Sequence, residues 1–382
     1  MRAADMLQVR EINQLSELAA LRDMWSRLLR ATPRYSFFQT LEWLEAAWPH
    51  YPQQRLRAVV VERDGEIIGI VPFCVRTEQR RIGAVRVLTY PLDDWSTFYG
   101  PISAEPVVVM KAALKHIQAT PHDWEFIDLR YVDQSAAEYS TIGETFRELG
   151  CRFFVRPRME VRFCSMAEGW EPYVESRSRN WRRQMRRDIE VLEKAGPVEL
   201  LRYRPEAGGT GRDARTVEIY EICEQIATKS WQAEAESQST LSSPRVRDLL
   251  LEFHCRAAAL GMLDTNILTV AGQPVAFNYN YVADGRTYGL RAGFDPTAEM
   301  EHCGRILLYK MLENSFARGD EEYSFGPGRQ AYKDRFATEM RYAYTFRSYS
   351  TATVKSRVLQ WREWIADSLY SEKDLIEKSL VD

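Results

Sequence analysis

The sequence predicts an α/β protein made of two domains of similar design, in each of which a mixed sheet is flanked by helices. Two hairpin turns lead to this prediction. Asp64-Gly65 separates two runs with strand character, and Ala271-Gly272-Gln273 does the same in the second half of the chain. Each hairpin is followed by a further strand, a helical stretch and another strand. The same order of elements in both halves indicates a duplicated domain.

In the first half of the chain, strands alternate with stretches of helical periodicity. The expected elements are helices over 12–30 and 41–48, strands over 57–62, 67–75 and 85–90, a helix over 107–119, a strand over 124–130, a helix over 142–150 and a strand over 153–163. The loop after the third strand holds two adjacent carboxylates, Asp93 and Asp94. We expect the first domain to cover residues 1–165.

The second half repeats this order after a set of helices. The expected elements are helices over 176–196, 214–235 and 246–260, strands over 265–270, 275–282 and 286–291, a loop over 293–302, a helix over 305–317 and a strand over 323–325. We expect a second domain over 166–350 and a helical tail over 351–382. The tail carries an apolar stripe made of Val354, Val358, Trp361, Ile365 and Leu369. Such a stripe can dock on the body of the protein, contact a partner or lie on a membrane. Because the polar face of this tail is mixed in charge, docking is expected.

The composition is that of a folded protein. Of 382 residues, 45% are hydrophobic and 12% aromatic, which is ample for packed interiors. The net charge of −3 argues against a general DNA or RNA binder. Six cysteines form no C-x-x-C pair and five histidines form no metal motif, so reduced thiols and no metal site are expected. No run approaches the ~18 apolar residues of a membrane span, which predicts a cytoplasmic protein without membrane insertion.

The helix expected over 176–196 has two unlike faces. One is an apolar stripe of Trp181, Met185, Ile189 and Leu192. The other carries the arginines Arg179, Arg182, Arg183, Arg186 and Arg187. Guanidinium groups bind phosphate through paired N–H donors, but charged helix faces are also commonly just solvated. Both interpretations stay open.

The stretch that follows the last strand is the candidate site. The strand expected at 323–325 ends in a Gly-Pro-Gly turn at 326–328, and Arg329, Tyr332 and Lys333 come directly after it. Exposed amides in such a turn act together with cationic side chains to bind an anion. An ordinary turn with solvated charges is the alternative.

A second feature lies at the helix expected over 305–317. This helix follows Gly304, so the amides of its first turn open toward the preceding loop. If the strands on either side of the helix are parallel, both features lie at the carboxyl edge of one sheet, where α/β proteins bind ligands. A nucleophile elbow, a P-loop and a dinucleotide fingerprint are missing, and Cys303 is expected to be a buried thiol. A phosphate-bearing cofactor is therefore favoured.

Several short motifs occur in a characteristic order. They are Phe37-Phe38-Gln39-Thr40-x-x-Trp43, the Arg-rich helix, Gly272-Gln273-Pro274-Val275-Ala276, Gly293-Phe294-Asp295-Pro296, Gly304-Arg305-x-Leu307-Leu308 and Gly326-x-Gly328-x-x-x-Tyr332-Lys333. This set resembles the GNAT acyltransferase superfamily, in particular its cellulose-biosynthesis-type branch, which is related to Fem-type aminoacyltransferases. The resemblance implies tandem GNAT-like domains, an acyl-CoA donor such as acetyl-CoA, and an amine acceptor, with a sugar or polysaccharide precursor as one candidate.

The resemblance also implies roles for single residues. The residues expected to hold the cofactor are Gly304, Arg305, Gly326, Gly328 and Arg329. Tyr332 would protonate the leaving thiolate, and Lys333 would stabilise developing negative charge. The candidates for binding the acceptor are Arg291, Asn278, Trp231, Asp94 and Arg183.

The chain departs from the family pattern at three places. His302-Cys303 replaces the usual Ser-Pro, Ser324 replaces an Asp before the Gly-rich turn, and Glu301 stands first in the phosphate loop. Two other functions therefore stay open. One is transfer from aminoacyl-tRNA, with the Arg-rich helix contacting RNA. The other is a binding or regulatory role without catalysis.

Overall fold

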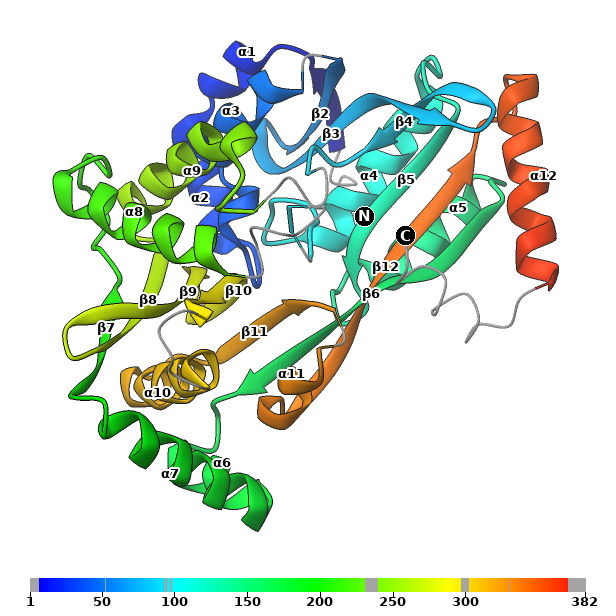
Figure 1. Ribbon diagram of the computed structural model, residues 1–382. Coiled ribbons are helices and arrows are strands. Elements are labelled where there is room, and N and C mark those ends of the chain that lie inside the picture. Colours follow the sequence, from blue (N-terminus) through cyan, green and yellow to red (C-terminus); the bar gives the residue numbers. More distant parts are fainter. Residues whose placement is uncertain are drawn as a thin grey trace. The chain divides into compact units, whose positions relative to one another are not determined.

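The computed structural model describes residues 7–51, 53–92, 95–96, 98–230, 240–296, 302–328 and 330–369. The chain divides into two compact units: unit 1 comprises Met1–Val161 and Arg341–Asp382, and unit 2 comprises Arg162–Met340. The chain leaves unit 1 within β6 (Phe153–Ser165) and returns to it within β12 (Glu339–Tyr349). Each unit has a mixed sheet flanked by helices, which confirms the predicted fold class (Figure 1).

Unit 1 is built on strands in the order β1-β2-β3-β4-β5-β12-β6. Its other strands are β1 (Leu7–Ile12), β2 (Gln54–Arg63), β3 (Glu66–Arg80), β4 (Gly83–Thr89) and β5 (Phe126–Asp133). Its helices are α1 (Leu15–Ala19), α2 (Arg22–Ala31), α3 (Leu41–Ala47), α4 (Pro106–Ala119), α5 (Tyr139–Glu148) and α12 (Val354–Leu369), with short 3-10 turns at Phe37–Gln39 and Trp48–His50. β4 and β5 are parallel, whereas the pairs from β1 to β4 are antiparallel.

The limits of the units differ from the domains expected from the sequence. β12 falls within the stretch 166–350 that we assigned to the second domain, but it pairs antiparallel with β5 and so belongs mostly to unit 1. The helix α12, expected in a separate tail, lies in unit 1 as well. A strand whose partner is about two hundred positions away in the chain leaves no local signal of where it pairs.

The helix expected over 12–30 is in fact preceded by a strand and divided in two. Leu21 leaves the α-helical region between α1 and α2, with φ of −96° and ψ of 14°. The strand β1 before them has one buried residue, Ile12, because it lies at the edge of the sheet. An edge strand with so little buried surface lacks the alternation of apolar and polar residues by which strands are recognised.

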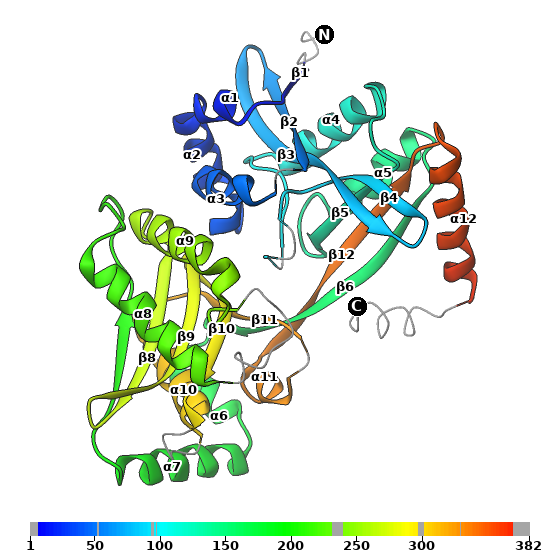
Figure 2. The ribbon, with the colours of Figure 1, turned by 45° about the horizontal axis from the view of Figure 1, so that its top comes forward.

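The apolar stripe of α12 does not dock on the body of unit 1, and that prediction was wrong. The helix packs through its other face, where Leu359 joins a cluster around Phe126 and Ser356 Oγ donates to the Glu125 carbonyl oxygen over 2.6 Å. Glu363, on the same inner face, accepts from Arg347 Nη1 over 3.3 Å. The inner face of α12 is therefore the one with Ser356, Leu359 and Glu363. In both ribbon views α12 lies at the margin of unit 1 (Figure 2).

The strands of unit 2 follow the order β11-β10-β9-β8-β7, with β6 next to β11. These strands are β7 (Val198–Tyr203), β8 (Leu263–Val270), β9 (Gln273–Ala283), β10 (Arg286–Phe294) and β11 (Glu322–Pro327). The helices are α6 (Trp170–Ser176), α7 (Arg179–Glu193), α8 (Ala214–Lys229), α9 (Arg247–Ala259), α10 (Cys303–Arg318) and α11 (Ala331–Phe336), with a 3-10 turn at Pro244–Val246. The single helix expected over 176–196 is thus α7 alone, capped by Ser178, whose side chain accepts from the Trp181 amide.

Helices cover both faces of the unit 2 sheet (Figure 1). On one face, His254 of α9 lies 3.1 Å from the hydroxyl of Tyr279 in β9. On the other face, the neighbouring Asn280 contacts Met311 of α10. Since successive residues of a strand point to opposite faces, α9 and α10 lie on opposite sides of the sheet. The strands β10 and β11 are parallel, as the predicted site requires.

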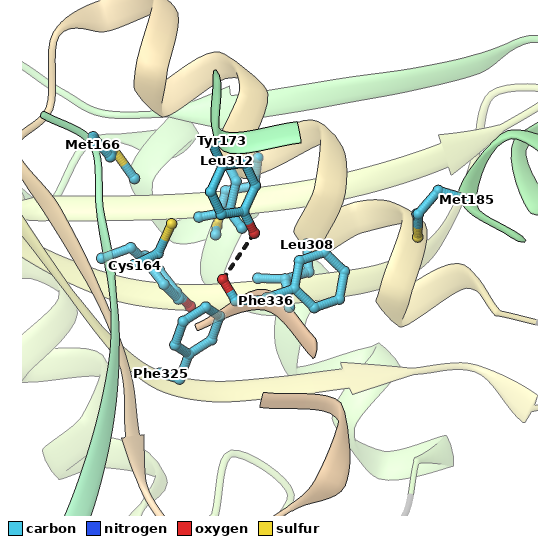
Figure 3. Packing of buried hydrophobic residues seen from close by; sticks show 10 residues of the cluster. Cys164, Met166, Tyr173, Met185, Leu308, Leu312, Phe325 and Phe336 are labelled. Atoms are coloured by element: carbon cyan, nitrogen blue, oxygen red, sulfur yellow. Dashed lines mark hydrogen bonds between the residues drawn. The ribbon is translucent and has the colours of Figure 1, made fainter. Parts of the chain in front are cut away.

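One hydrophobic cluster fixes the segment that carries the candidate site (Figure 3). Its buried members are Cys164, Met166, Tyr173, Met185, Leu308, Met311, Leu312, Tyr323, Phe325 and Phe336. Tyr173 donates its hydroxyl hydrogen to the Phe336 carbonyl oxygen over 2.8 Å. Phe325 thus anchors the end of β11 and Phe336 the end of α11, so the turn between them is held at both sides.

Candidate active site

The parallel strands β10 and β11 pair over a short distance and then separate. Their last pair is Tyr288 with Ser324. β10 continues along β9 as far as Phe294, with a bulge between Gly289 and Arg291, and β11 continues to Pro327. A bulge bends its strand and increases the local twist. The ladder between the two strands therefore ends at their carboxyl ends, where α/β sheets bind ligands.

Two glycines, Gly289 and Gly326, allow the backbones of β10 and β11 to approach closely just before the two strands separate. A Cβ atom on Gly289 would lie 2.6 Å from both the Ser324 carbonyl oxygen and the Tyr323 hydroxyl. Gly326 has φ of 70°, and a Cβ atom there would lie 2.8 Å from the Gly289 carbonyl oxygen. The Gly326 amide donates to Ser324 Oγ over 3.3 Å, so this serine supports the turn at the place where the family pattern has Asp. Neither glycine has room for a side chain.

Lys333 is buried, with only 4% of its surface exposed. Its ammonium group donates to the carbonyl oxygens of Gly326, over 3.3 Å, and Pro327, over 2.5 Å. Burial, helped by the guanidinium of Arg162, lowers the pKa of Lys333 to about 8. The side chain ties α11 to the Gly-Pro-Gly turn and places one positive charge beside the end of β11. It is not a solvated surface cation.

Tyr332 precedes Lys333 on α11 and is 44% exposed. It is therefore not a core aromatic residue. Partial burial raises the pKa of the Tyr332 hydroxyl above its ordinary value. The hydroxyl consequently keeps its proton at neutral pH.

The first turn of α10 forms the second part of the site. The helix begins at Cys303, and the N-cap His302 adopts the left-handed conformation with φ of 71°. The amides of Arg305 and Ile306 both donate to the His302 carbonyl oxygen over 3.0 Å. A Cβ atom on Gly304 would make an ordinary contact, 3.5 Å from the side chain of Phe294 at the end of β10. The amino end of α10 thus faces the end of β10, an arrangement that suits an anion.

Arg305 already has an anionic partner. Its Nη2 donates to Asp188, a buried residue of α7. Asp188 also accepts from Gln184 Nε2 over 2.7 Å. An arginine that is paired with a carboxylate has less charge to offer to a phosphate. Arg305 was expected to hold phosphate, but its partner Asp188 lies 117 positions earlier in the chain and leaves no local signal in the sequence.

Two predicted acceptor residues are not brought together. Arg291 of β10 lies opposite Tyr279 of β9, whereas Asn278 is the next residue along β9 and points to the other face of the sheet. Arg291 lies near the buried Tyr220, Tyr279 and Tyr281, and burial lowers its pKa while the tyrosines act against that shift. Arg291 and Asn278 therefore cannot form a single binding site.

Tyr323, which the sequence analysis did not single out, lies at the point where the strands separate. Its hydroxyl is within hydrogen-bond distance of Asn278 Oδ1, at 3.1 Å, and of Asn280 Oδ1, at 3.3 Å. Asn280 Nδ2 in turn donates to the fully buried Asp264 over 3.1 Å. The strict alternation of Asn and Tyr over 278–281 is a signal that could have found this network. Asn278 acts here as a partner of Tyr323.

The remaining predicted residues fall into two groups. Arg183 is exposed on α7, as are Arg179, Arg186 and Arg187, so the arginine face is open to solvent. Outside the described residues lie Asp94, Trp231 and Arg329, and with them Asp93 and Glu301. Gly328 follows Pro327 with φ of 102° and completes the turn.

The described residues were also searched for a metal site, a reactive cysteine and a membrane-spanning helix. In that part no group of three or more His, Cys, Asp or Glu side chains could hold a metal ion. Cys303 is buried, and burial raises the pKa of its thiol to about 11, as expected for a packed cysteine. None of the helices within these residues is long and apolar enough to cross a membrane.

Residues 179–334 match the model of a protein family described as "Acetyltransferase (GNAT) domain". This stretch includes the strands β10 and β11, the start of α10 and the Gly-Pro-Gly turn. Residues 179–334 are therefore similar to a GNAT-type acetyltransferase domain. The resemblance to the cellulose-biosynthesis-type branch stays a prediction.

The whole chain is similar in fold to several solved structures. FemX shares 11% identity at a TM-score of 0.57, with 88% of this chain and 96% of FemX covered. L-PGS from Bacillus licheniformis shares 12% identity at 0.54, covering 88% and 94%. A conserved protein of unknown function from Bacteroides thetaiotaomicron shares 14% at 0.56, covering 90% and 100%. No curated protein sequence matches the chain. At these identities the likeness is one of fold alone.

Proposed function

We propose that unit 2 transfers an acyl group from acyl-CoA to an amine acceptor. The observation that carries this proposal is the separation of β10 and β11 at Gly289 and Gly326, with the buried Lys333 beside it. The match of residues 179–334 to the GNAT domain supports the same chemistry. Acetyl-CoA is the proposed donor.

Acyl-CoA, when bound, supplies an activated thioester. The amino end of α10 at Gly304 suits its phosphates, because amides and helix dipole act together there. Arg305 would bind the phosphates as well only if its ion pair with Asp188 opened. Among the described residues, the site therefore offers backbone donors more than free cations to the cofactor, and the turn 326–328 is held in place to contact it.

In the proposed reaction the amine nitrogen bonds to the thioester carbonyl carbon while the carbon–sulfur bond breaks. Most of the rate would come from holding both reactants in line. Tyr332, which is 44% exposed, donates a proton to the departing thiolate, and the proton lost by the amine passes to solvent. Lys333 keeps the turn closed through the carbonyl oxygens of Gly326 and Pro327, and its charge favours the negative charge that develops nearby.

The arginine face of α7 supports a second candidate for the donor, aminoacyl-tRNA. Four exposed arginines, Arg179, Arg183, Arg186 and Arg187, would contact a phosphate backbone. The same face would equally accept a phosphorylated or acidic acceptor, such as a sugar or polysaccharide precursor. We favour binding of a phosphorylated or acidic acceptor over binding of tRNA, because the overall charge of −3 gives no general attraction for RNA.

Calorimetric titration with acetyl-CoA tests the proposal. We expect saturable binding to one site, followed by release of free thiol when primary amines are added. Failure to bind any acyl-CoA would contradict the proposal. Binding without thiol release would favour a binding or regulatory protein, and a salt-sensitive complex with aminoacyl-tRNA would favour the second donor.

A further inference from the structure

The outer face of α12 in unit 1 exposes large apolar side chains. Val354 is 76% exposed, Trp361 is 61% exposed and Trp364 is 55% exposed, and Val358 lies between them on the same side of the helix. Positions 354, 358, 361 and 365 follow one another at helical spacing, so they form one continuous stripe. An apolar stripe of this kind on a helix of a soluble protein marks a surface for interaction.

This exposure does not result from a loosely held helix. The inner face of α12 is fixed by Leu359 in a buried cluster and by the bond from Ser356 to Glu125. Glu363 is directed inward as well, toward Arg347 and the hydroxyl of Tyr349, each at 3.3 Å. The stripe is thus presented to the outside by a helix whose other face is fully engaged.

The charges that flank the stripe have one sign. Arg357 and Arg362 are exposed on either side of it. Lys355, which lies next to Arg362 around the helix, donates to the Ala84 carbonyl oxygen. Between Val354 and Ile365 the sequence contains one acidic residue, Glu363, and that residue faces inward. Between Val354 and Ile365 the outer face therefore combines tryptophan and valine side chains with two exposed arginines and no outward acid.

We propose that this face of α12 binds the surface of a lipid bilayer that contains anionic lipids. Helices that lie in the membrane interface combine an apolar face with flanking Lys and Arg, and tryptophan is enriched at the level of the lipid head groups. The cations complement the negative surface of anionic lipids. A helix lying flat on the bilayer needs no membrane-spanning segment.

The charges argue against a second copy of the chain as the occupant. A twofold interface brings the same patch of both subunits together. Arg357 and Arg362 of one copy would then approach the same cations of the other, without an outward acid between Val354 and Ile365 to compensate them. An anionic lipid surface meets both the apolar stripe and the cations, so it is the better fit.

Cosedimentation of the full chain with vesicles tests this proposal. We expect binding to vesicles of phosphatidylglycerol and phosphatidylcholine in equal parts, weak binding to phosphatidylcholine alone, and loss of binding as salt is raised. Trp361→Glu combined with Val358→Glu should weaken binding to the anionic vesicles by about tenfold or more. Arg357→Glu with Arg362→Glu should weaken it as well. The thermal unfolding of these variants should stay close to that of the wild type, since the changed side chains are exposed.

The arginine face of α7 provides a matched control. Arg183→Glu with Arg187→Glu removes the same number of exposed cations from a helix whose stripe residues Met185 and Leu192 are buried. The proposal predicts that this pair leaves vesicle binding nearly unchanged. It is overturned if the wild-type chain binds neither kind of vesicle, or if the α7 pair loses as much binding as the α12 variants. It is also overturned if sedimentation velocity shows a dimer that Trp361→Glu dissociates.

Discussion

Replacing Gly326 by alanine tests the geometry of the site, and Gly272→Ala in the β8–β9 hairpin is its control. Both glycines have positive φ, 70° for Gly326 and 78° for Gly272, so either alanine costs about 1–2 kcal/mol of backbone strain. At Gly272 the new Cβ atom would have no neighbour within 4 Å. At Gly326 it would lie 2.8 Å from the Gly289 carbonyl oxygen, which must move away.

The two variants should therefore differ in function more than in stability. We expect Gly272→Ala to lower the free energy of unfolding by about 1 kcal/mol and Gly326→Ala by about 1–3 kcal/mol, since the second also displaces backbone. Denaturant unfolding measures both values. Acetyl-CoA binding, measured by calorimetry, should weaken by at least about tenfold in Gly326→Ala and stay unchanged in Gly272→Ala. If both variants bind acetyl-CoA as the wild type does, the point where β10 and β11 separate is not the cofactor site.

Three further predictions concern single side chains. Because burial lowers the pKa of Lys333 to about 8, the folded protein loses this proton before the unfolded chain, whose lysine titrates near 10.5. The unfolding free energy of the wild type should therefore rise by up to about 3 kcal/mol between pH 8 and 10.5, relative to that of Lys333→Met. Denaturant unfolding at several pH values measures this rise. If the unfolding free energies of the two proteins change equally with pH, Lys333 is not buried. Tyr332→Phe should lower the rate of thiol release by about tenfold or more at unchanged melting temperature, and an unchanged rate would remove Tyr332 from the reaction. Asp188→Asn should tighten acetyl-CoA binding in calorimetry, because it frees Arg305; unchanged affinity would mean that Arg305 does not contact the phosphates.

The elements with strong local signals could be predicted from the sequence. Asp64 and Gly65 both have positive φ, 52° and 84°, as the hairpin prediction requires. The helix before Gly319 ends there, with that glycine in the left-handed conformation. Such features depend on a few neighbouring residues, so the sequence predicts them well, and the alternation of strands and helices in both halves follows from them.

The features that depend on distant contacts could not be predicted in this way. The partner of Arg305 is Asp188, and the partner of the Phe336 carbonyl oxygen is the Tyr173 hydroxyl, 163 positions away in the chain. The stripe of α12 was expected to dock on unit 1, but the face that does so carries Ser356 and Leu359, whose partners lie near Glu125 and Phe126 in the first half of the chain. None of these contacts has a signal in the local sequence.

Hydrogen–deuterium exchange of the full chain with and without acetyl-CoA tests the central claim most directly. The account predicts that acetyl-CoA slows exchange at three stretches of unit 2: residues 289–294 of β10, the first turn of α10 at 303–306, and 324–333 from the end of β11 into α11. Protection at these three stretches together would place the cofactor where the parallel strands separate. Exchange that is unchanged there, or slowed only in unit 1, would contradict the account.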